Sequence, residues 1–274
     1  MKKIFTLLLA NLLLVAGSNL KADDAYTVGI VPQYEASKIH KIWRPILDYL
    51  EQETSEKFEL RGSYSIPAFE KQFSAGAFDF AYMNPYHLVI ANEKAGYIPL
   101  FRDNGRKLFG VLVTRKDSGI ESPADLQDKF VAFPAPNALG ASLQIRQELK
   151  EVFKIDIKPM YVKTHDSVYL NVLMQRATAG GGVQKTLSQQ KQDYQDALKI
   201  IHTTTPINPH PFAALPRIPE ELRTKITNAI IALGNTEEGK VLLSKVPYKQ
   251  VGPAAMDDYK PLLEMGLQKY YVSE

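Results

Sequence analysis

The sequence of 274 residues contains no cysteine. This absence excludes disulfide bonds, thiolate metal sites, cysteine nucleophiles and a lipid anchor on cysteine. The chain has 5 histidines, but they form no HExxH motif and no HxxxH pair. The sequence therefore predicts neither a metal centre nor a cofactor.

A long apolar run is also lacking. Lys2 and Lys3 precede an apolar stretch from Ile4 to Ala16, which small and polar residues follow. This stretch of about 13 residues is shorter than the roughly 20 that span a bilayer, and the pattern is that of a secretory signal peptide. We expect cleavage after Ala22, a periplasmic location and no stable membrane insertion.

No excess of positive charge remains once this segment is removed. The full chain has 33 Lys and Arg residues and 30 Asp and Glu residues, and residues 1–22 contain three lysines and no acidic residue. Basic and acidic residues are therefore equal in number in the rest of the chain. Because no block of basic residues occurs either, we expect no nucleic-acid-binding surface.

Strand and helix patterns alternate through the first hundred or so residues. The strand patterns are YTVGIVPQ, FELRGSYS and FDFAYMNP, and the helical patterns are SKIHKIWRPILDYLEQET, IPAFEKQFSAG and PYHLVIANEKAG. Such alternation favours a mostly parallel sheet with helices on both faces.

A second α/β stretch interrupts the first. It lies between a strand that leaves the first unit, FGVLVTR, and a proline-rich return, TTTPINPHPF. This plan predicts two lobes joined by two crossings, with a ligand between them at the carboxyl ends of strands. We expect a signal peptide over 1–22, the first part of lobe 1 over 23–115, lobe 2 over 116–203, and the return crossing with the completion of lobe 1 over 204–274.

The stretch VAFPAPNALGAS leads from an apolar strand through a loop into the helical pattern LQIRQELKEVF. A helix start presents free backbone N–H groups and the positive end of the helix dipole, which together attract anions. Local geometry leaves two interpretations open: a ligand cradle, or only a turn between a strand and a helix.

Five segments in order carry a resemblance to a known family: FDFAYMNPYH, VAFPAPNALGAS, YVKTHDSVYLNVLMQ, AGGGVQKT and TTTPINPHP. The chain resembles, from about Tyr26 to Leu233, the phosphonate-binding group of periplasmic solute-binding proteins, which serve ABC importers for phosphate, phosphite and phosphonates. The resemblance implies the α/β two-lobe clamshell of type II periplasmic binding proteins, each lobe a mixed, mostly parallel sheet flanked by helices.

The resemblance also implies ligand-binding side chains. An aromatic pair that lines the cleft in the family corresponds to Tyr64 and Tyr82, with Asn84 and Tyr86 beside the latter. A phenol suits a cleft because its ring packs on a ligand while its hydroxyl donates to an oxyanion. His165 corresponds to a histidine that hydrogen-bonds the anion. The alternative for each of these residues is an ordinary structural role.

At the helix start the chain departs from the family. Phosphonate binders carry hydroxyl residues where this chain has Ala138, Leu139 and Gly140. We expect weak phosphonate binding unless other groups replace these donors, since each charge-assisted hydrogen bond contributes roughly 1.5–3 kcal/mol. The alternative is a helix start packed under the cleft. The contacts predicted from this stretch are Asn137, Leu139, Gly140, Ala141 and Ser142.

Two further positions differ from the family in charge. Aminophosphonate binders carry carboxylates for the ligand's ammonium group where this chain has Lys185 and His210. A lysine repels an ammonium, so we expect a ligand without an amine, unless Lys185 points to solvent. The neighbouring glycines 180–182 allow either close backbone approach or an anion-holding nest.

The sequence thus predicts a binding protein and not an enzyme. Ser142, His165 and Asp166 have the residue types of a catalytic triad, but no GxSxG motif surrounds the serine. We expect a monomer that captures a small anionic solute of the phosphonate and phosphate class by lobe closure, for an inner-membrane ABC permease. An extracytoplasmic sensor that docks on a membrane receptor or kinase is the alternative, and a hydrolase is a remote one.

Overall fold

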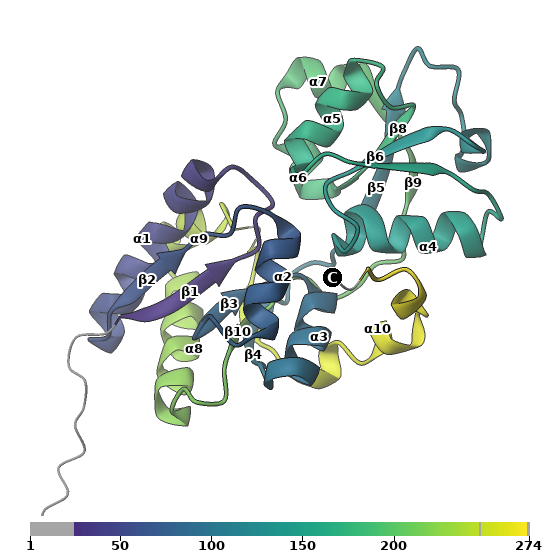
Figure 1. Ribbon diagram of the computed structural model, residues 1–274. Coiled ribbons are helices and arrows are strands. Elements are labelled where there is room, and N and C mark those ends of the chain that lie inside the picture. The colour runs from purple at the N-terminus through teal and green to yellow at the C-terminus, as the bar shows by residue number, and fades with distance from the viewer. Residues whose placement is uncertain (1–24, 247, 273–274) are drawn as a thin grey trace, which may run out of the picture.

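The computed structural model describes residues 25–246 and 248–272, so the expected signal peptide lies outside the described residues. The described chain forms two lobes, each built from a sheet and its flanking helices (Figure 1). None of the helices within these two ranges is long and apolar enough to cross a membrane.

The first lobe contains a six-stranded sheet in the order β11-β4-β10-β3-β1-β2. Its strands are β1 (Tyr26–Ile30), β2 (Phe58–Arg61), β3 (Phe80–Tyr82), β4 (Ile98–Asp103), β10 (Phe212–Ala214) and β11 (Val251–Pro253). β1 is parallel to β2 and β3, whereas β10 is antiparallel to both β3 and β4. The strands β1 to β4 therefore run in one direction, as expected for a mostly parallel sheet.

Helices complete the first lobe. They are α1 (Ala36–Thr54), α2 (Ile66–Ser74), α3 (Pro85–Ala95), α8 (Glu220–Gly234), α9 (Glu237–Leu243) and α10 (Pro261–Glu264), with the short turns η3 (Met256–Asp258) and η4 (Leu267–Lys269). The apolar stripe of α1 buries Trp43, Ile46, Leu47 and Leu50, as its sequence period predicts. Trp43 packs against Tyr82 with ring centroids 4.9 Å apart, which connects this core to the end of β3.

The second lobe contains a five-stranded sheet in the order β7-β6-β8-β5-β9. Its strands are β5 (Gly110–Arg115), β6 (Phe130–Phe133), β7 (Lys158–Tyr161), β8 (Ala179–Val183) and β9 (Leu198–Thr203). β6 is parallel to β7 and β8, and β5 is antiparallel to β8 and β9, so β6 to β9 share one direction. Its helical segments are η1 (Pro123–Leu126), η2 (Leu139–Leu143), α4 (Gln144–Glu151), α5 (His165–Leu173), α6 (Gln184–Ser188) and α7 (Gln192–Ala197).

The strand β5 belongs to the second lobe, whereas the sequence predicts it in the first. The boundary at residue 115 places it in lobe 1, but β5 pairs with β8 and β9 inside the second sheet. An apolar strand has the same sequence pattern in either lobe, so the pattern alone does not assign it. The crossings therefore comprise residues 104–109 and 204–211, and they pair with each other through a bridge between Leu108 and Ile207.

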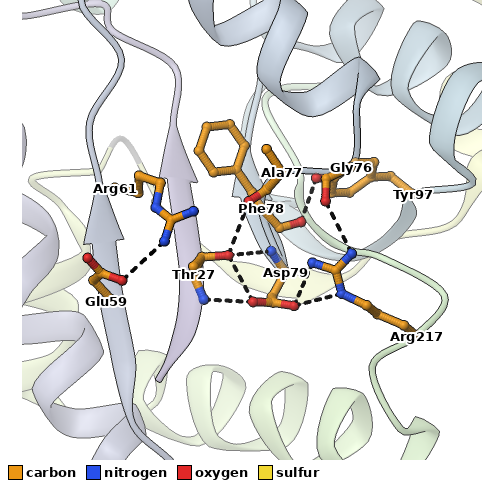
Figure 2. Close-up of polar contacts among 9 residues, drawn as sticks. All are labelled: Thr27, Glu59, Arg61, Gly76, Ala77, Phe78, Asp79, Tyr97 and Arg217. Atoms are coloured by element: carbon orange, nitrogen blue, oxygen red, sulfur yellow. Dashed lines mark hydrogen bonds and ion pairs between the residues drawn. The ribbon is translucent and has the colours of Figure 1, made fainter. Parts of the chain in front are cut away.

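A polar network joins three segments of the first lobe (Figure 2). The Asp79 carboxylate accepts hydrogen bonds from N and Oγ1 of Thr27, each at 2.8 Å, and from Nε of Arg217 at 2.9 Å. Arg217 also donates to the carbonyl of Gly76 at 3.1 Å. Asp79 thus ties β1 to the segment before β3 and to the loop before α8.

We expect Asp79→Ala to lower the free energy of unfolding by about 2 kcal/mol, because the Thr27 amide and the Arg217 guanidinium lose their acceptor. Chemical denaturation measures the change. Asp117→Ala is the matched control, since Asp117 is 68% exposed and pairs with Arg115 on the surface, where such pairs contribute little to stability. Equal small effects of the two substitutions would contradict a structural role for the network.

Candidate functional site

A cleft between the lobes contains two adjacent cavities. The larger has a volume of about 50 Å³, and we call it the cationic chamber; its defining residues are Tyr82, Arg106, Lys107, Lys185, His210 and Tyr248. The smaller has a volume of about 10 Å³, and we call it the helix-start chamber; its defining residues are Asn84, Leu139, Gly140, Ala141 and His165. Gln33, Val183 and His210 line both chambers, so the two cavities are neighbours that share this wall.

Most of the residues predicted for the site line this cleft. They are Tyr82, Asn84, Leu139, Gly140, Ala141, His165, Lys185 and His210. They come from the end of β3, the starts of η2, α5 and α6, and the second crossing. The carboxyl ends of strands in both lobes thus contribute to the cleft, as the interrupted sequence plan predicts.

Other residues predicted for the site lie elsewhere. Tyr64 is 93% exposed on the loop between β2 and α2 and lines neither chamber. Tyr86 is buried and packs against Tyr271, with ring centroids 5.7 Å apart. Ser142 is fully buried, and its hydroxyl accepts a hydrogen bond from Nε of Arg146 at 3.2 Å.

Asn137 connects the two lobes with the C-terminal segment. Its Nδ2 donates to Oε2 of Glu70 at 2.9 Å and to the carbonyl of Val272 at 2.8 Å, and its Oδ1 accepts from the Val272 amide at 2.9 Å. Its carbonyl accepts from Nδ2 of Asn84 at 3.1 Å. Protein groups therefore occupy the polar atoms of the Asn137 side chain, which is 1% exposed.

The helix start is held in place by close backbone packing. η2 runs directly into α4 and packs on β5 and β8. A Cβ added at Gly181 would lie 2.0 Å from the carbonyl oxygen of Ala141, and one at Gly110 would lie 1.8 Å from that of Gly140. The glycines of β8 thus permit close approach of backbone. The amides of the first turn of a helix have no intrahelical partner, and Leu139, Gly140 and Ala141 of this turn line the smaller chamber.

Two neutral imidazoles border the cleft. His165 begins α5, and its Nδ1 lies 3.2 Å from Oγ1 of Thr186. Burial lowers the pKa of His165 to about 4, against an opposing effect of Asp166. His210 lies 3.1 Å from the Gln33 amide nitrogen, and burial lowers the pKa of His210 to about 3. Both rings are therefore uncharged at pH 7.

This neutrality predicts a pH dependence of folding. The pKa of His165 and His210 in the folded chain lies below that of an unfolded histidine, about 6.5, so only the unfolded chain binds these protons between roughly pH 6.5 and 4. Stability is full above that range and falls as the pH drops, with each imidazole contributing up to about 1.4 kcal/mol per pH unit.

Chemical denaturation between pH 7 and pH 4 measures this slope. We expect His165→Gln to give a shallower slope than the wild-type protein. Substitution of His40, which is exposed on α1, serves as the control for loss of an imidazole outside the cleft. An unchanged slope in His165→Gln would show that the imidazole is not buried and neutral.

Positive charge gathers in the larger chamber. Arg106 and Lys107 lie on the first crossing, and Lys185 lies on α6 of the second lobe. Partial burial and then the charge of Arg106 lower the pKa of Lys185. Asp103 is the acidic residue among the described lining residues, and it is 1% exposed. Its carboxylate already accepts from the amides of Gly105 and Gln250 and from Arg106.

Three tyrosines complete the walls. Tyr82 is 4% exposed, stacks on His210 with ring centroids 5.3 Å apart, and has a pKa that burial raises, so its hydroxyl stays protonated. Tyr34 donates across the cleft to Oε1 of Gln189 at 2.5 Å. Tyr248 is 5% exposed, and its buried hydroxyl has no hydrogen-bond partner within the described residues.

Sequence reasoning does not identify four of the lining residues, which are Gln33, Arg106, Thr186 and Tyr248. Gln33 follows β1 at its carboxyl end, a position that favours ligand contact in such sheets, and Arg106 lies in a crossing that the lobe plan already places beside the cleft. Tyr248 comes from the C-terminal part of the chain, where no local pattern marks a cleft residue.

Comparison with known proteins identifies the family. Residues 28–259 match the family described as "ABC transporter, phosphonate, periplasmic substrate-binding protein". The chain belongs to this family. As a periplasmic substrate-binding protein of the phosphonate ABC transporter family, it is a binding component and not an enzyme, and the family implies a small-molecule ligand and a membrane permease as partner.

Solved structures share the fold. The binding protein component of an ABC phosphonate transporter from Pseudomonas aeruginosa aligns with a TM-score of 0.80 at 16% identity, over 89% of this chain and 86% of that chain. PhnD1 from Prochlorococcus marinus, in complex with methylphosphonate, aligns with a TM-score of 0.81 at 14% identity, over 90% and 99%. A Xanthomonas citri protein bound to ATP aligns with a TM-score of 0.74 at 14% identity, over 90% and 98%. These likenesses confirm the expected type II clamshell.

Proposed function

We propose that this substrate-binding protein captures a small anionic solute of the phosphonate and phosphate class and delivers it to an inner-membrane ABC permease. The observation that supports this proposal is the charge of the cleft. Arg106, Lys107 and Lys185 line it, whereas the acidic group among its described lining residues, Asp103, is already engaged by protein donors. Positive potential in a cleft attracts and retains an anion.

The helix-start chamber would receive the oxyanion head group. A volume of about 10 Å³ admits one water-sized group, so one oxygen enters beside the amides of Gly140 and Ala141. The rest of the head group would lie at the junction of the chambers, against His210 and Gln33. Backbone amides would thus replace the missing hydroxyl donors. The proposed contact residues are Gln33, Tyr82, Asn84, Leu139, Gly140, Ala141, His165, Lys185 and His210.

Binding would act through closure of the lobes. A solute in this position contacts η2 and α6 of one lobe and β3 of the other only when the lobes are together, and that difference in contacts favours the closed state. The hydrogen bond from Tyr34 to Gln189 belongs to the same closed arrangement. The proposal includes a monomer in the periplasm, released by cleavage after Ala22 as the N-terminal pattern indicates.

Calorimetry and thermal unfolding of the purified protein test this function. Phosphate, phosphite and methylphosphonate should bind and raise Tm by amounts set by their concentrations relative to Kd. 2-Aminoethylphosphonate should bind more weakly than methylphosphonate, because its ammonium group meets Lys185. The proposal fails if none of these oxyanions binds, or if 2-aminoethylphosphonate binds the tightest.

A further inference from the structure

The cleft carries more positive charge than an oxyanion at the helix start requires. Among the described residues that line the helix-start chamber there is no Lys or Arg. The three cations Arg106, Lys107 and Lys185 all line the cationic chamber. Because Gln33 and His210 border both cavities and contact each other at 3.1 Å, a solute that parts these two side chains would reach both cavities.

Several donors of the cationic chamber lack an acceptor. Arg106 uses Nε to bond Asp103 at 2.7 Å, and its Nη atoms make no hydrogen bond within residues 25–246 and 248–272. Lys185 has no ion-pair partner in the same part of the chain. The hydroxyl of Tyr248, a residue 5% exposed, is buried without any partner that the structure describes. A buried hydroxyl without a partner is unfavourable, and an acceptor on a ligand would remove that cost.

The positive charges of Arg106 and Lys185 are only partly balanced by the acidic side chain among the described lining residues. Asp103 already accepts from the amides of Gly105 and Gln250 and from Arg106, so it does not compensate Lys185. Arg106 and Lys185 approach from different parts of the fold, and the charge of Arg106 lowers the pKa of Lys185. An anion between these two side chains would replace their repulsion with attraction from both sides.

We propose that the solute carries a second anionic group, which binds in the cationic chamber while its oxyanion head group lies at the helix start. This inference rests on the proposed function and specifies its substrate class: a phosphonate or phosphate joined by a short linker to a carboxylate or a second oxyanion. A chamber of about 50 Å³ admits roughly four water-sized groups. A carboxylate with one methylene is a group of that size.

Calorimetry with matched phosphonates tests this proposal on the purified protein. Phosphonoacetate carries the second charge, propylphosphonate has similar size without it, and 2-aminoethylphosphonate carries the opposite charge. We expect phosphonoacetate to bind about 10- to 100-fold more tightly than propylphosphonate, the gain of one or two charge-assisted contacts. Equal affinities of phosphonoacetate and propylphosphonate would overturn the second anionic subsite.

Two substitutions locate the second group. Lys185→Gln should weaken phosphonoacetate about 10-fold and methylphosphonate less than about 3-fold. Lys129→Gln removes the same charge from an exposed position of the second lobe and should change neither affinity. Tyr248→Phe should weaken phosphonoacetate several-fold without lowering the stability of the free protein, because the hydroxyl has no partner there within the described chain. Equal losses for phosphonoacetate and methylphosphonate in Lys185→Gln would contradict the assignment.

The results separate this inference from the function on which it rests. If no phosphonate binds, the proposed function and the second subsite both fail. If methylphosphonate binds but phosphonoacetate gains nothing over propylphosphonate, the anion-binding function stands and only the second subsite is wrong.

Discussion

Lys185→Glu should invert the charge preference of the cleft. Methylphosphonate should bind more weakly to the variant, and 2-aminoethylphosphonate more tightly, so that the ratio of the two affinities changes by about 100-fold. The physical reason is that Lys185 shares the cationic chamber with Arg106 and has no ion-pair partner within the described residues. A glutamate at this position attracts an ammonium group, which the lysine repels. It repels an anion, which the lysine attracts.

Calorimetric titration of both ligands into the variant and the wild-type protein measures this ratio. Lys129→Glu applies the same change of charge at an exposed site remote from the lining residues and is the matched control. A ratio that is the same in Lys185→Glu as in the control would show that the Lys185 side chain lies in solvent when the ligand is bound.

Gly110→Ala should destabilise the protein by about 3 kcal/mol or prevent its folding. The added Cβ would lie 1.8 Å from the carbonyl oxygen of Gly140 and 2.7 Å from its carbonyl carbon, and these are backbone atoms that no rotamer change can move. Relief of the clash requires η2 to move away from β5. Because η2 presents the amides of the helix-start chamber, a folded variant should also lose affinity for methylphosphonate.

Gly62→Ala provides the control, since a Cβ at Gly62 meets no atom within 4 Å. It should leave stability within about 0.5 kcal/mol of the wild-type value or raise it slightly, through loss of entropy in the unfolded chain. Chemical denaturation compares the two variants. Similar stabilities would mean that the contact between β5 and η2 does not position the helix start.

Much of the fold can be predicted from the sequence because its signals are local. The apolar stripe of α1, the proline near the start of α3 and the glycine after its end define those helices, and Gly96 adopts the positive φ of 76° that such a helix end requires. The placement of β5 depends instead on strand pairing over long sequence separations. The residues of an apolar strand do not indicate which sheet it joins, so the lobe of β5 cannot be predicted from its own sequence.

The site is predictable only in part, for a related reason. The resemblance to the family indicates Tyr82 and His165, and the local pattern of a strand, a loop and a helix start indicates the stretch that begins η2. Asn137 and Tyr86 occur in the same motifs but are directed into contacts with the C-terminal residues Val272 and Tyr271. These partners lie far away in the sequence. No local pattern therefore distinguishes the residues that face the cleft from those that fasten the C-terminal segment.

The stretch from Val131 to Ser142 contains both predictable and unpredictable features. Its strand, loop and helix start form as predicted, and its amides line the smaller chamber. The helix start lacks the hydroxyl residues of the phosphonate binders, and it packs tightly on glycines of β5 and β8. The Lys and Arg side chains that line the cleft lie outside this stretch, on the first crossing and on α6. On the proposed function, recognition of an anion would be shared between backbone dipoles and distant cations.

A crystal structure of the protein with methylphosphonate tests the central claim most directly. We predict the phosphonate between the lobes, with at least one oxygen within hydrogen-bonding distance of the amides of Gly140 and Ala141 and its methyl group directed toward Lys185. A phosphonate bound outside the cleft, or one held only by Arg106 and Lys185 with no oxygen at the helix start, would contradict the account.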